Sequence, residues 1–326
     1  MPRSIMMLTV LKISLRLVLQ LMLVIILAWC LLAFSPLDPI YSYLNGNVFA
    51  VSAAQKVQML QQLHLDLSWW QSFGLWLGHV FHGDFGYSNL YHQPVTEVIC
   101  QRGGLSFLLM GLSWGIALLM GYGLGLLAGL YQNRLADKII RTTAWLLASV
   151  PPFWLGMVLI SLFSVTLKWT PVCCAAPYDS SFSAQSFTSM LAHLALPVTT
   201  LVLIYMAPLA LHTREKVVDV LNDAPALYSQ LHGQSAVAVT QFHVVKNSLL
   251  PAVILHFSHF AELFSGSILA ETIFNYPGLG QTLVKAGLAS DSALFMGATV
   301  LGALLVFTSN GIASLLALKL TPGALR

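Results

Sequence analysis

Six stretches of the sequence are apolar over a length that can cross a lipid bilayer. A hydrocarbon core about 30 Å thick needs about 20 apolar residues in an α-helix, because each residue adds about 1.5 Å. Such stretches lie at about residues 15–34, 105–130, 143–167, 191–211, 249–270 and 294–318. Of the 326 residues, 57% are hydrophobic and only 8% are charged, a balance that would leave a soluble protein with far too apolar a surface. We therefore predict an all-α, polytopic membrane protein with six transmembrane helices.

The positively charged residues are distributed unevenly between the two sides of these segments. An even number of spans places both termini on the same side, and most of the 15 Lys and Arg residues lie on that side. They are Arg3, Lys12, Arg16, Arg134, Lys138, Arg141, Arg214, Lys216, Lys246, Lys319 and Arg326. Because cytoplasmic loops carry an excess of Lys and Arg, we expect both termini in the cytoplasm. The net charge of +3 reflects this bias and does not indicate a nucleic-acid partner.

The predicted spans divide the chain into three parts. Residues 1–35 form the N-terminal cytoplasmic end and the first helix, which has no small-residue cleavage pattern and is expected to stay uncleaved. Residues 36–104 form an extracytoplasmic segment. Residues 105–326 form a five-helix core whose longest cytoplasmic loop covers residues 212–248.

Two features of the core bear on its packing. Six glycines in the second apolar segment allow close approach of neighbouring helices. They are Gly111, Gly115, Gly121, Gly123, Gly125 and Gly129. In the third segment, Pro151-Pro152 should kink the helix, because proline removes a backbone donor and clashes with the preceding turn.

Several kinds of chemistry have no signature in this sequence. It contains no GxxxxGK[ST] loop to cradle phosphates, so ATP hydrolysis by that route would have to come from other subunits. The four cysteines lack zinc-type spacing: Cys30 and Cys100 are isolated, and Cys173 and Cys174 are adjacent in an external loop. We expect the adjacent pair to be unpaired thiols or to bond elsewhere, with soft-metal capture as the alternative. A channel or transporter subunit is favoured over an intramembrane enzyme.

A string of turn-forming residues with one carboxylate separates the last two apolar segments. It reads Glu271-Thr272-Ile273-Phe274-Asn275-Tyr276-Pro277-Gly278-Leu279-Gly280. This string closely resembles the signature of permease subunits in the dipeptide, oligopeptide and nickel ABC importer family. Further matches to the family lie earlier in the chain, in the order in which the family has them, and include residues 83–88, 149–155 and 247–251. The family signature would thus comprise Glu271, Pro277, Gly278 and Gly280, with Glu271 capping the turn or contacting a docked binding protein.

The resemblance implies a type I ABC importer permease fold in the bacterial cytoplasmic (inner) membrane. It implies four kinds of neighbour: a second homologous permease subunit, two ATPase subunits, an extracytoplasmic substrate-binding protein and membrane lipid. ATP would be used by the partner subunits, and this chain would bind no cofactor of its own.

The loop at 212–248 resembles the family's cytoplasmic coupling loop, whose short helix docks in a cleft of the ATPase subunit. Small residues permit close approach, and a glycine permits an unhindered helix end. The residues expected at this joint are Ala224, Ala226, Ser229 and Gly233. The loop departs from the family at Pro225, which should interrupt the helix, and at Leu227, Gln230 and His232, where basic residues are usual. An ordinary interhelix connector is the alternative.

The fifth apolar segment carries the sharpest clue to the substrate. His256, His259 and Glu262 recur at three-residue steps, which on a continuous helix spreads them over about 120° of one face. Ionisable groups at membrane depth cost about 2.5–3.5 kcal/mol each and generally face a pathway. Imidazole and carboxylate ligands, with the polarizable Met206 elsewhere in the pathway, suit nickel, free or chelated, moved by alternating access. The alternatives are di- or oligopeptide import, with the same residues contacting a peptide amine, and a purely structural role.

Overall fold

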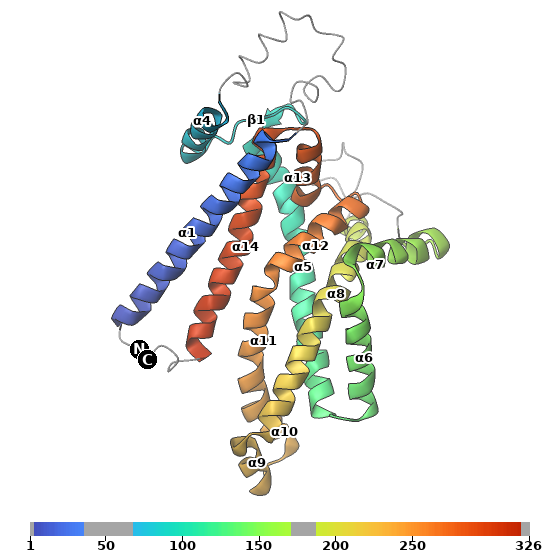
Figure 1. The fold of residues 1–326 in the computed structure, drawn as a ribbon. Helices are drawn as coiled ribbons and strands as arrows, with labels where there is room; N and C mark the ends of the chain where they lie inside the picture. The colour runs from blue at the N-terminus through green and yellow to red at the C-terminus, as the bar shows by residue number, and fades with distance from the viewer. Residues whose placement is uncertain (1–2, 36–67, 171–186, 321–326) are drawn as a thin grey trace, which may run out of the picture. The chain divides into compact units, whose positions relative to one another are not determined.

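The computed structural model describes residues 3–35, 68–170 and 187–320, and helices dominate these ranges (Figure 1). The two strands within them, β1 (Tyr87–Ser88) and β2 (Gln93–Pro94), pair antiparallel as a short hairpin. The α-helices are α1 (Arg3–Ala33), α4 (Trp69–Phe81), α5 (Val95–Leu130), α6 (Leu135–Ser149), α7 (Pro152–Leu159), α8 (Phe187–Asn222), α9 (Ala224–Leu231), α10 (Ala236–Val239), α11 (Lys246–Ser258), α12 (Phe260–Ile273), α13 (Leu279–Leu288) and α14 (Ser292–Leu320). Two π-helical segments, η2 (Ile160–Thr166) and η4 (Thr240–Val245), interrupt this series. The predicted thiols Cys173 and Cys174 lie outside the described residues.

Five of the described helical segments are long and apolar enough to cross a membrane. They are Leu11–Ala33, Val95–Leu130, Ala192–Asn222, Ala236–Ser258 and Ser292–Leu318. A sixth span results if the bent pair Leu135–Ser149 and Pro152–Thr166 is counted as one. The predicted all-α, polytopic membrane fold is confirmed.

The third apolar segment is sharply bent at its two prolines. The helical stretches on either side of the break meet at 105°, and Figure 1 shows α7 leaving the end of α6 at this angle. Val150 and Pro151 have extended backbones with ψ of 130° and 136°. Each of them precedes a proline, whose ring disfavours the helical region for the residue before it. Pro152 itself begins α7, where a missing amide hydrogen costs little. The predicted kink is confirmed.

The fifth apolar segment, expected at about residues 249–270, is divided between two helices. The helix begins earlier, as part of a continuous stretch from Ala236 to Ser258, and breaks at His259. The Ser309 hydroxyl donates a 2.9 Å hydrogen bond to the carbonyl oxygen of Phe257, which a regular helix would bond to an amide four residues later. A side chain that inserts into this ladder kinks a helix. α12 then starts at Phe260.

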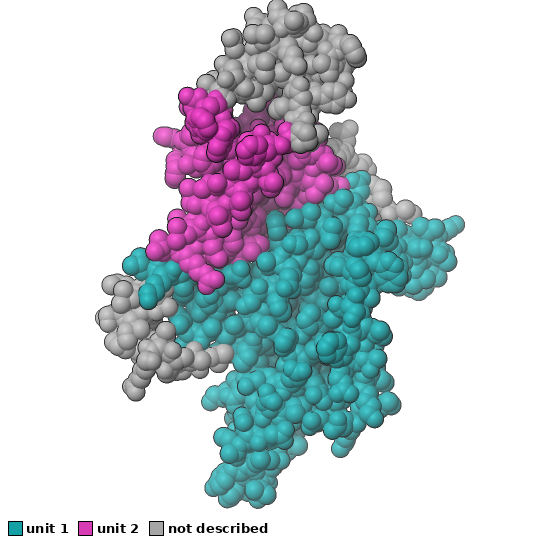
Figure 2. All heavy atoms as spheres, in the orientation of Figure 1, with its two compact units in different colours: residues 1–14, 108–276, 308–326 teal, residues 15–107, 277–307 magenta. Residues whose placement is uncertain are grey.

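Contacts divide the chain into two compact units, coloured separately in Figure 2. Unit 1 comprises residues 1–14, 108–276 and 308–326, and unit 2 comprises residues 15–107 and 277–307. Each unit combines segments that are far apart in the sequence. The boundaries predicted at residues 35 and 104 were drawn at the ends of membrane spans, whereas these units are defined by contacts within the chain. The predicted boundaries therefore stay predictions.

Unit 2 is organised around two apolar clusters and one buried carboxylate. In one cluster, Ile25 of α1 packs with Met296 and Val300 of α14. The Asp291 carboxylate accepts hydrogen bonds from the Ser88 hydroxyl at 2.7 Å and from the Leu90 amide at 3.0 Å, as well as from the first turn of α14. Asp291 therefore anchors the β1–β2 hairpin to the start of α14.

In unit 1, three glycines of α5 lie directly against α8. A Cβ atom added at Gly125 would lie 2.6 Å from the carbonyl oxygen of Ala210, and one at Gly121 would lie 2.9 Å from the carbonyl oxygen of Met206. Gly129 is similarly tight against Val217. The close approach predicted for the glycines is thus confirmed at three positions four residues apart. Around the other three, Gly111, Gly115 and Gly123, nothing lies within 4 Å of an added Cβ.

One ion pair joins α6 to α8 in the same unit. Arg214 donates from Nε and Nη2 to the two carboxylate oxygens of Asp137 at 3.0 and 2.9 Å. The Asp137 side chain is fully buried, and it also accepts a 2.8 Å bond from the Asn133 amide. This bidentate geometry holds the turn between α5 and α6 against α8.

Candidate functional site

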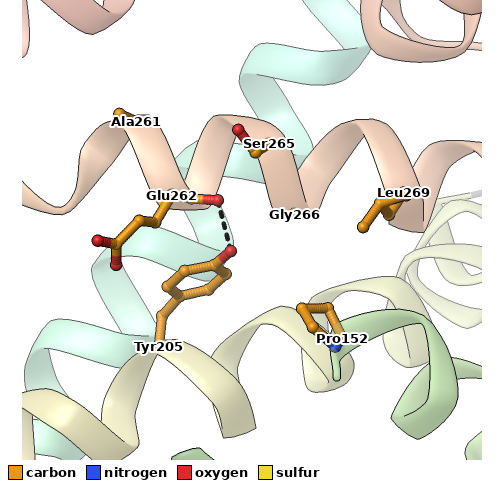
Figure 3. Close-up of a pocket in the computed structure, with 7 residues that line it drawn as sticks. All are labelled: Pro152, Tyr205, Ala261, Glu262, Ser265, Gly266 and Leu269. Carbon is orange, nitrogen blue, oxygen red and sulfur yellow. Dashed lines mark hydrogen bonds between the residues drawn. The ribbon is translucent and has the colours of Figure 1, made fainter. Parts of the chain in front are cut away.

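A pocket lies in unit 1 where α12 faces α8 and the start of α7 (Figure 3). Its volume is about 330 Å³, which is within the range of small-molecule sites. Its walls are formed by Pro152, Tyr205, Ala261, Glu262, Ser265, Gly266 and Leu269. These side chains are mostly apolar or small, and only one of them carries a charge. Such a site suits a small molecule with a cationic group.

Tyr205 and Gly266 set how closely α12 approaches α8. The Tyr205 hydroxyl donates a hydrogen bond to the backbone carbonyl oxygen of Glu262, drawn as the dashed line in Figure 3. Gly266 lies one turn further along α12, and a Cβ atom there would overlap the Tyr205 hydroxyl. The absent side chain at Gly266 is therefore what lets the tyrosine reach the helix backbone.

The Glu262 carboxylate is exposed and directed away from the Tyr205 hydroxyl (Figure 3). Within the described residues it forms no hydrogen bond or ion pair. An ionised carboxylate on an apolar helix is expensive unless it faces water or a polar partner. Glu262 can therefore serve as a counter-charge for a cation that enters the pocket.

The other predicted pathway residues are not among those that line this pocket. His256 is buried, its Nε2 lies 2.9 Å from the carbonyl oxygen of Trp114, and its ring packs on the Trp114 indole at 4.7 Å. His259 lies half-buried at the break between α11 and α12. Met206 is buried in a cluster with Ala117. The break removes the continuous helical face on which the prediction of a shared histidine and glutamate surface rested.

The structure does not assemble the predicted metal set of His256, His259 and Glu262. Among the described residues, no group of three or more His, Cys, Asp or Glu side chains is placed to hold a metal ion. Sequence reasoning identified Glu262 but missed Tyr205 and Gly266. The only local signal for Tyr205 was a polar hydroxyl within an apolar run. Its position beside Glu262 depends on how α8 packs on α12, which is a tertiary contact.

The predicted signature string forms a buried turn between α12 and α13. Glu271 is fully buried in the last turn of α12, and its carbonyl oxygen accepts a 2.8 Å bond from the Tyr276 amide. Burial raises the pKa of the Tyr276 hydroxyl, and the nearby Glu271 carboxylate raises it further, so this phenol stays neutral. Pro277 then leads to Gly278, which precedes the first residue of α13, and Gly280 is buried in its first turn. The Glu271 side chain has no exposed surface, and the role of its carboxylate stays a prediction.

The loop between α8 and α11 contains the predicted short helix, α9. Ala226 and Ser229 are buried, Ala224 is exposed, and Gly233 follows the helix end with a positive φ of 79°. The expectation that Pro225 interrupts the helix is wrong. It occupies the first turn of α9, where an amide hydrogen has no partner within the helix anyway.

The outer face of α9 and of the segment after it is apolar and exposed. The side chains concerned are Leu227, Tyr228, Leu231, Val237 and Phe242, exposed by 44%, 62%, 86%, 70% and 68%. Figure 1 shows α9 and α10 beyond the ends of α8 and α11. An exposed apolar surface of this kind suits contact with a partner protein.

Comparison with known proteins places these features in context. Residues 121–325 match the family described as binding-protein-dependent transport system inner membrane component. A solved structure described as a crystal structure of an amino acid ABC transporter with histidines is similar over 69% of this chain and 93% of its own chain, with a TM-score of 0.48 and 12% sequence identity.

Curated relatives match over most of the chain. A putative peptide permease protein of Brucella ovis is 31% identical, over 87% of this chain and 88% of its own length. An oligopeptide transport system permease protein of Bacillus subtilis is 30% identical, over 89% of this chain and 90% of its own length. A glutathione transport system permease protein of Salmonella choleraesuis is 33% identical, over 85% of each chain.

Proposed function

The chain belongs to the family of binding-protein-dependent transport system inner membrane components, and on this premise we propose that it is the permease subunit of an ABC importer of small peptides. Membership makes it a transport component and not an enzyme, which excludes the intramembrane enzyme considered from the sequence. The observation that carries the peptide proposal is similarity over 85% to 89% of the chain to permeases named for peptides, oligopeptides or glutathione.

Nickel, the leading prediction from the sequence, has less support. Its basis was a shared face of His256, His259 and Glu262, and the helix breaks in the middle of that set. The His256 ring is also engaged by the backbone of Trp114. We therefore rank peptide import above nickel import as the proposed function.

In this proposal the pocket beside α12 forms one wall of the translocation path. The exposed Glu262 carboxylate pairs with the N-terminal ammonium group of a passing peptide. Ser265 offers a hydroxyl, and Ala261 and Leu269 offer apolar surface to peptide side chains. A path should bind its cargo weakly enough to release it, and one charge on a wide pocket meets that need.

The remaining parts of the assembly follow from the family. A second homologous permease supplies the opposite wall, an extracytoplasmic binding protein delivers the peptide, and two ATPase subunits bind at α9 and drive alternating access. The distribution of Lys and Arg supports a cytoplasmic position for α9 and both termini, in the bacterial inner membrane. ATP is then used by the partners, and this chain holds no cofactor.

Peptide uptake by cells that express the complete transporter tests this function. Radiolabelled trialanine, glutathione and nickel are supplied separately to cells that lack their other peptide and nickel importers. We expect one or both peptides to accumulate in an ATP-dependent way and nickel not to accumulate. Nickel uptake without peptide uptake would overturn the proposal.

The role of Glu262 is tested in the same cells with Glu262→Gln. Loss of one partly exposed ion pair, worth about 1 kcal/mol, should lower peptide uptake about fivefold at equal membrane levels. Glu215→Gln is the matched control, because it neutralises an exposed carboxylate of α8 that lies outside the pocket. N-acetylated trialanine, which has no ammonium group, should be insensitive to the Glu262 change. Equal uptake of trialanine by both variants would refute the ammonium pairing.

A further inference from the structure

The short helix α9 has very little contact with the rest of unit 1. Of its residues, only Ala226 and Ser229 are buried. The chain turns at both of its ends, at Asp223, which has an extended backbone, and at Gly233, which has a positive φ of 79°. The backbone therefore does not hold α9 in line with α8 or α11, and the contacts of its buried face decide its orientation.

One side-chain hydrogen bond ties this face to another helix. The Ser229 hydroxyl oxygen lies 2.9 Å from Nε2 of His243. In the described part of the chain it is the only side-chain hydrogen bond between α9 and another element. A serine hydroxyl can donate to a bare Nε2 or accept from an Nε2–H, so the bond can form with either tautomer of the imidazole.

His243 belongs to a long helical stretch that leads to the pocket. It lies in η4, which continues α10 and passes into α11 with helical backbone angles at Val239 and Lys246. The stretch Ala236–Ser258 is 23 residues long, or about 34 Å at helical rise. It ends at Ser258, and after His259 the helix α12 begins at Phe260 with Glu262 in its first turn. We call Ala236–Ser258 the rod.

Two contacts tie the rod to neighbouring helices of unit 1. Near His243, the buried Val244 packs with Val217 and Val220 of α8. Further along, the Ser248 hydroxyl lies 3.1 Å from that of Tyr122 on α5. The π-helical turn that carries His243 is a rare local geometry that recurs at functional sites.

We propose that Ser229 and His243 form a positioning joint, through which a displacement of α9 reaches the rod and the pocket residues of α12. This inference rests on the proposed function, in which α9 receives the ATPase subunits. Leu227, Tyr228 and Leu231 remain exposed for that contact, on the side of α9 away from the joint. Ser229 and His243 touch neither peptide nor nucleotide and act by orienting α9.

The joint is tested in proteoliposomes that contain the complete transporter with its ATPase subunits and its binding protein. The readout is the amount of radiolabelled trialanine or glutathione, whichever the wild type carries, transported per ATP hydrolysed. Ser229→Ala and His243→Phe each remove the bond, and Ser229→Thr and His243→Gln each keep a polar group in its place. Thr240→Val is the matched control, because that hydroxyl bonds only to the carbonyl of Ala236 in its own helical stretch.

We expect Ser229→Ala and His243→Phe to lower the transported amount per ATP by about threefold to fivefold, the factor that one net hydrogen bond supplies. The double variant should lose no more than either single one, and the Thr, Gln and Val variants should match the wild type. Unchanged ratios in both bond-removing variants would overturn the joint. Loss of the ATPase subunits from Ser229→Ala would also overturn it, because the bond would then serve assembly. A wild type that hydrolyses ATP but moves no peptide would instead sink the proposed function.

Discussion

Replacing Gly125 with alanine tests whether α5 and α8 pack through their backbones. The new Cβ atom would lie 2.6 Å from the Ala210 carbonyl oxygen and 2.6 Å from the Thr213 Cβ, whereas comfortable contacts begin near about 3.5 Å. The two helices would therefore have to separate by roughly 1 Å. Overpacking typically costs about 1–3 kcal/mol. Because separation also loosens the contacts at Gly121 and Gly129, we expect about 2–3 kcal/mol here.

Thermal unfolding of the purified transporter in detergent measures this loss. An unfolding entropy of about 2.1 cal/mol/K per residue amounts to about 0.7 kcal/mol/K for 326 residues, so Gly125→Ala should unfold about 3–5 °C lower. Gly123→Ala is the matched control on the same helix, since nothing lies within 4 Å of a Cβ there. Its midpoint should be unchanged or slightly higher, because alanine favours helix over glycine. Equal midpoints for the two variants would refute the close crossing of α5 and α8.

Two further perturbations test contacts that hold unit 1 together. Asp137→Asn breaks the bidentate pair with Arg214 and should lower the free energy of unfolding by about 2–3 kcal/mol in the same assay, less than for a fully buried pair because Arg214 is partly exposed. A double variant with Arg214→Gln should lose clearly less than the sum of the two single losses. Simple additivity of the two losses would contradict the pairing. Gly266→Ala should push the Tyr205 hydroxyl off the Glu262 carbonyl and lower peptide uptake several-fold at equal membrane levels. Adding Tyr205→Phe removes the overlapping oxygen and should restore part of that uptake, so a double variant no better than Gly266→Ala would contradict the steric argument.

Much of the fold was predictable because membrane insertion is a local matter. A helix that crosses a bilayer needs only enough consecutive apolar residues, and the runs that begin near residues 15, 105, 191 and 294 all became candidate spans. Pro151-Pro152 bends its segment through the stereochemistry of adjacent residues alone. The short helix before Gly233 likewise follows from a local stop signal.

The candidate site was only partly predictable, because it depends on contacts between distant residues. Glu262 stood out as an ionisable group in an apolar run, and the structure places it in a pocket. The shared face of His256, His259 and Glu262 was inferred for a continuous helix, whereas the segment breaks at His259, one residue before α12 begins. Tyr205 lies 57 positions from Glu262, and nothing in its neighbourhood announces their contact.

The sequence by itself determined that the chain lies in a membrane, that its fold is all-α, and that it carries the family signature. The apolar lengths, the charge distribution and the ten-residue string behind these conclusions are all properties of the linear sequence. Only the tertiary structure decided which of the six glycines lie against α8, where the fifth segment breaks, and which helix Ser229 is bonded to. A glycine that lies against α8 and one that does not are the same residue in the sequence. A backbone carbonyl can likewise accept a hydrogen bond from a residue near it or far from it in the sequence. What differs is the neighbour that folding brings within reach, and this is not encoded in any single stretch of the sequence.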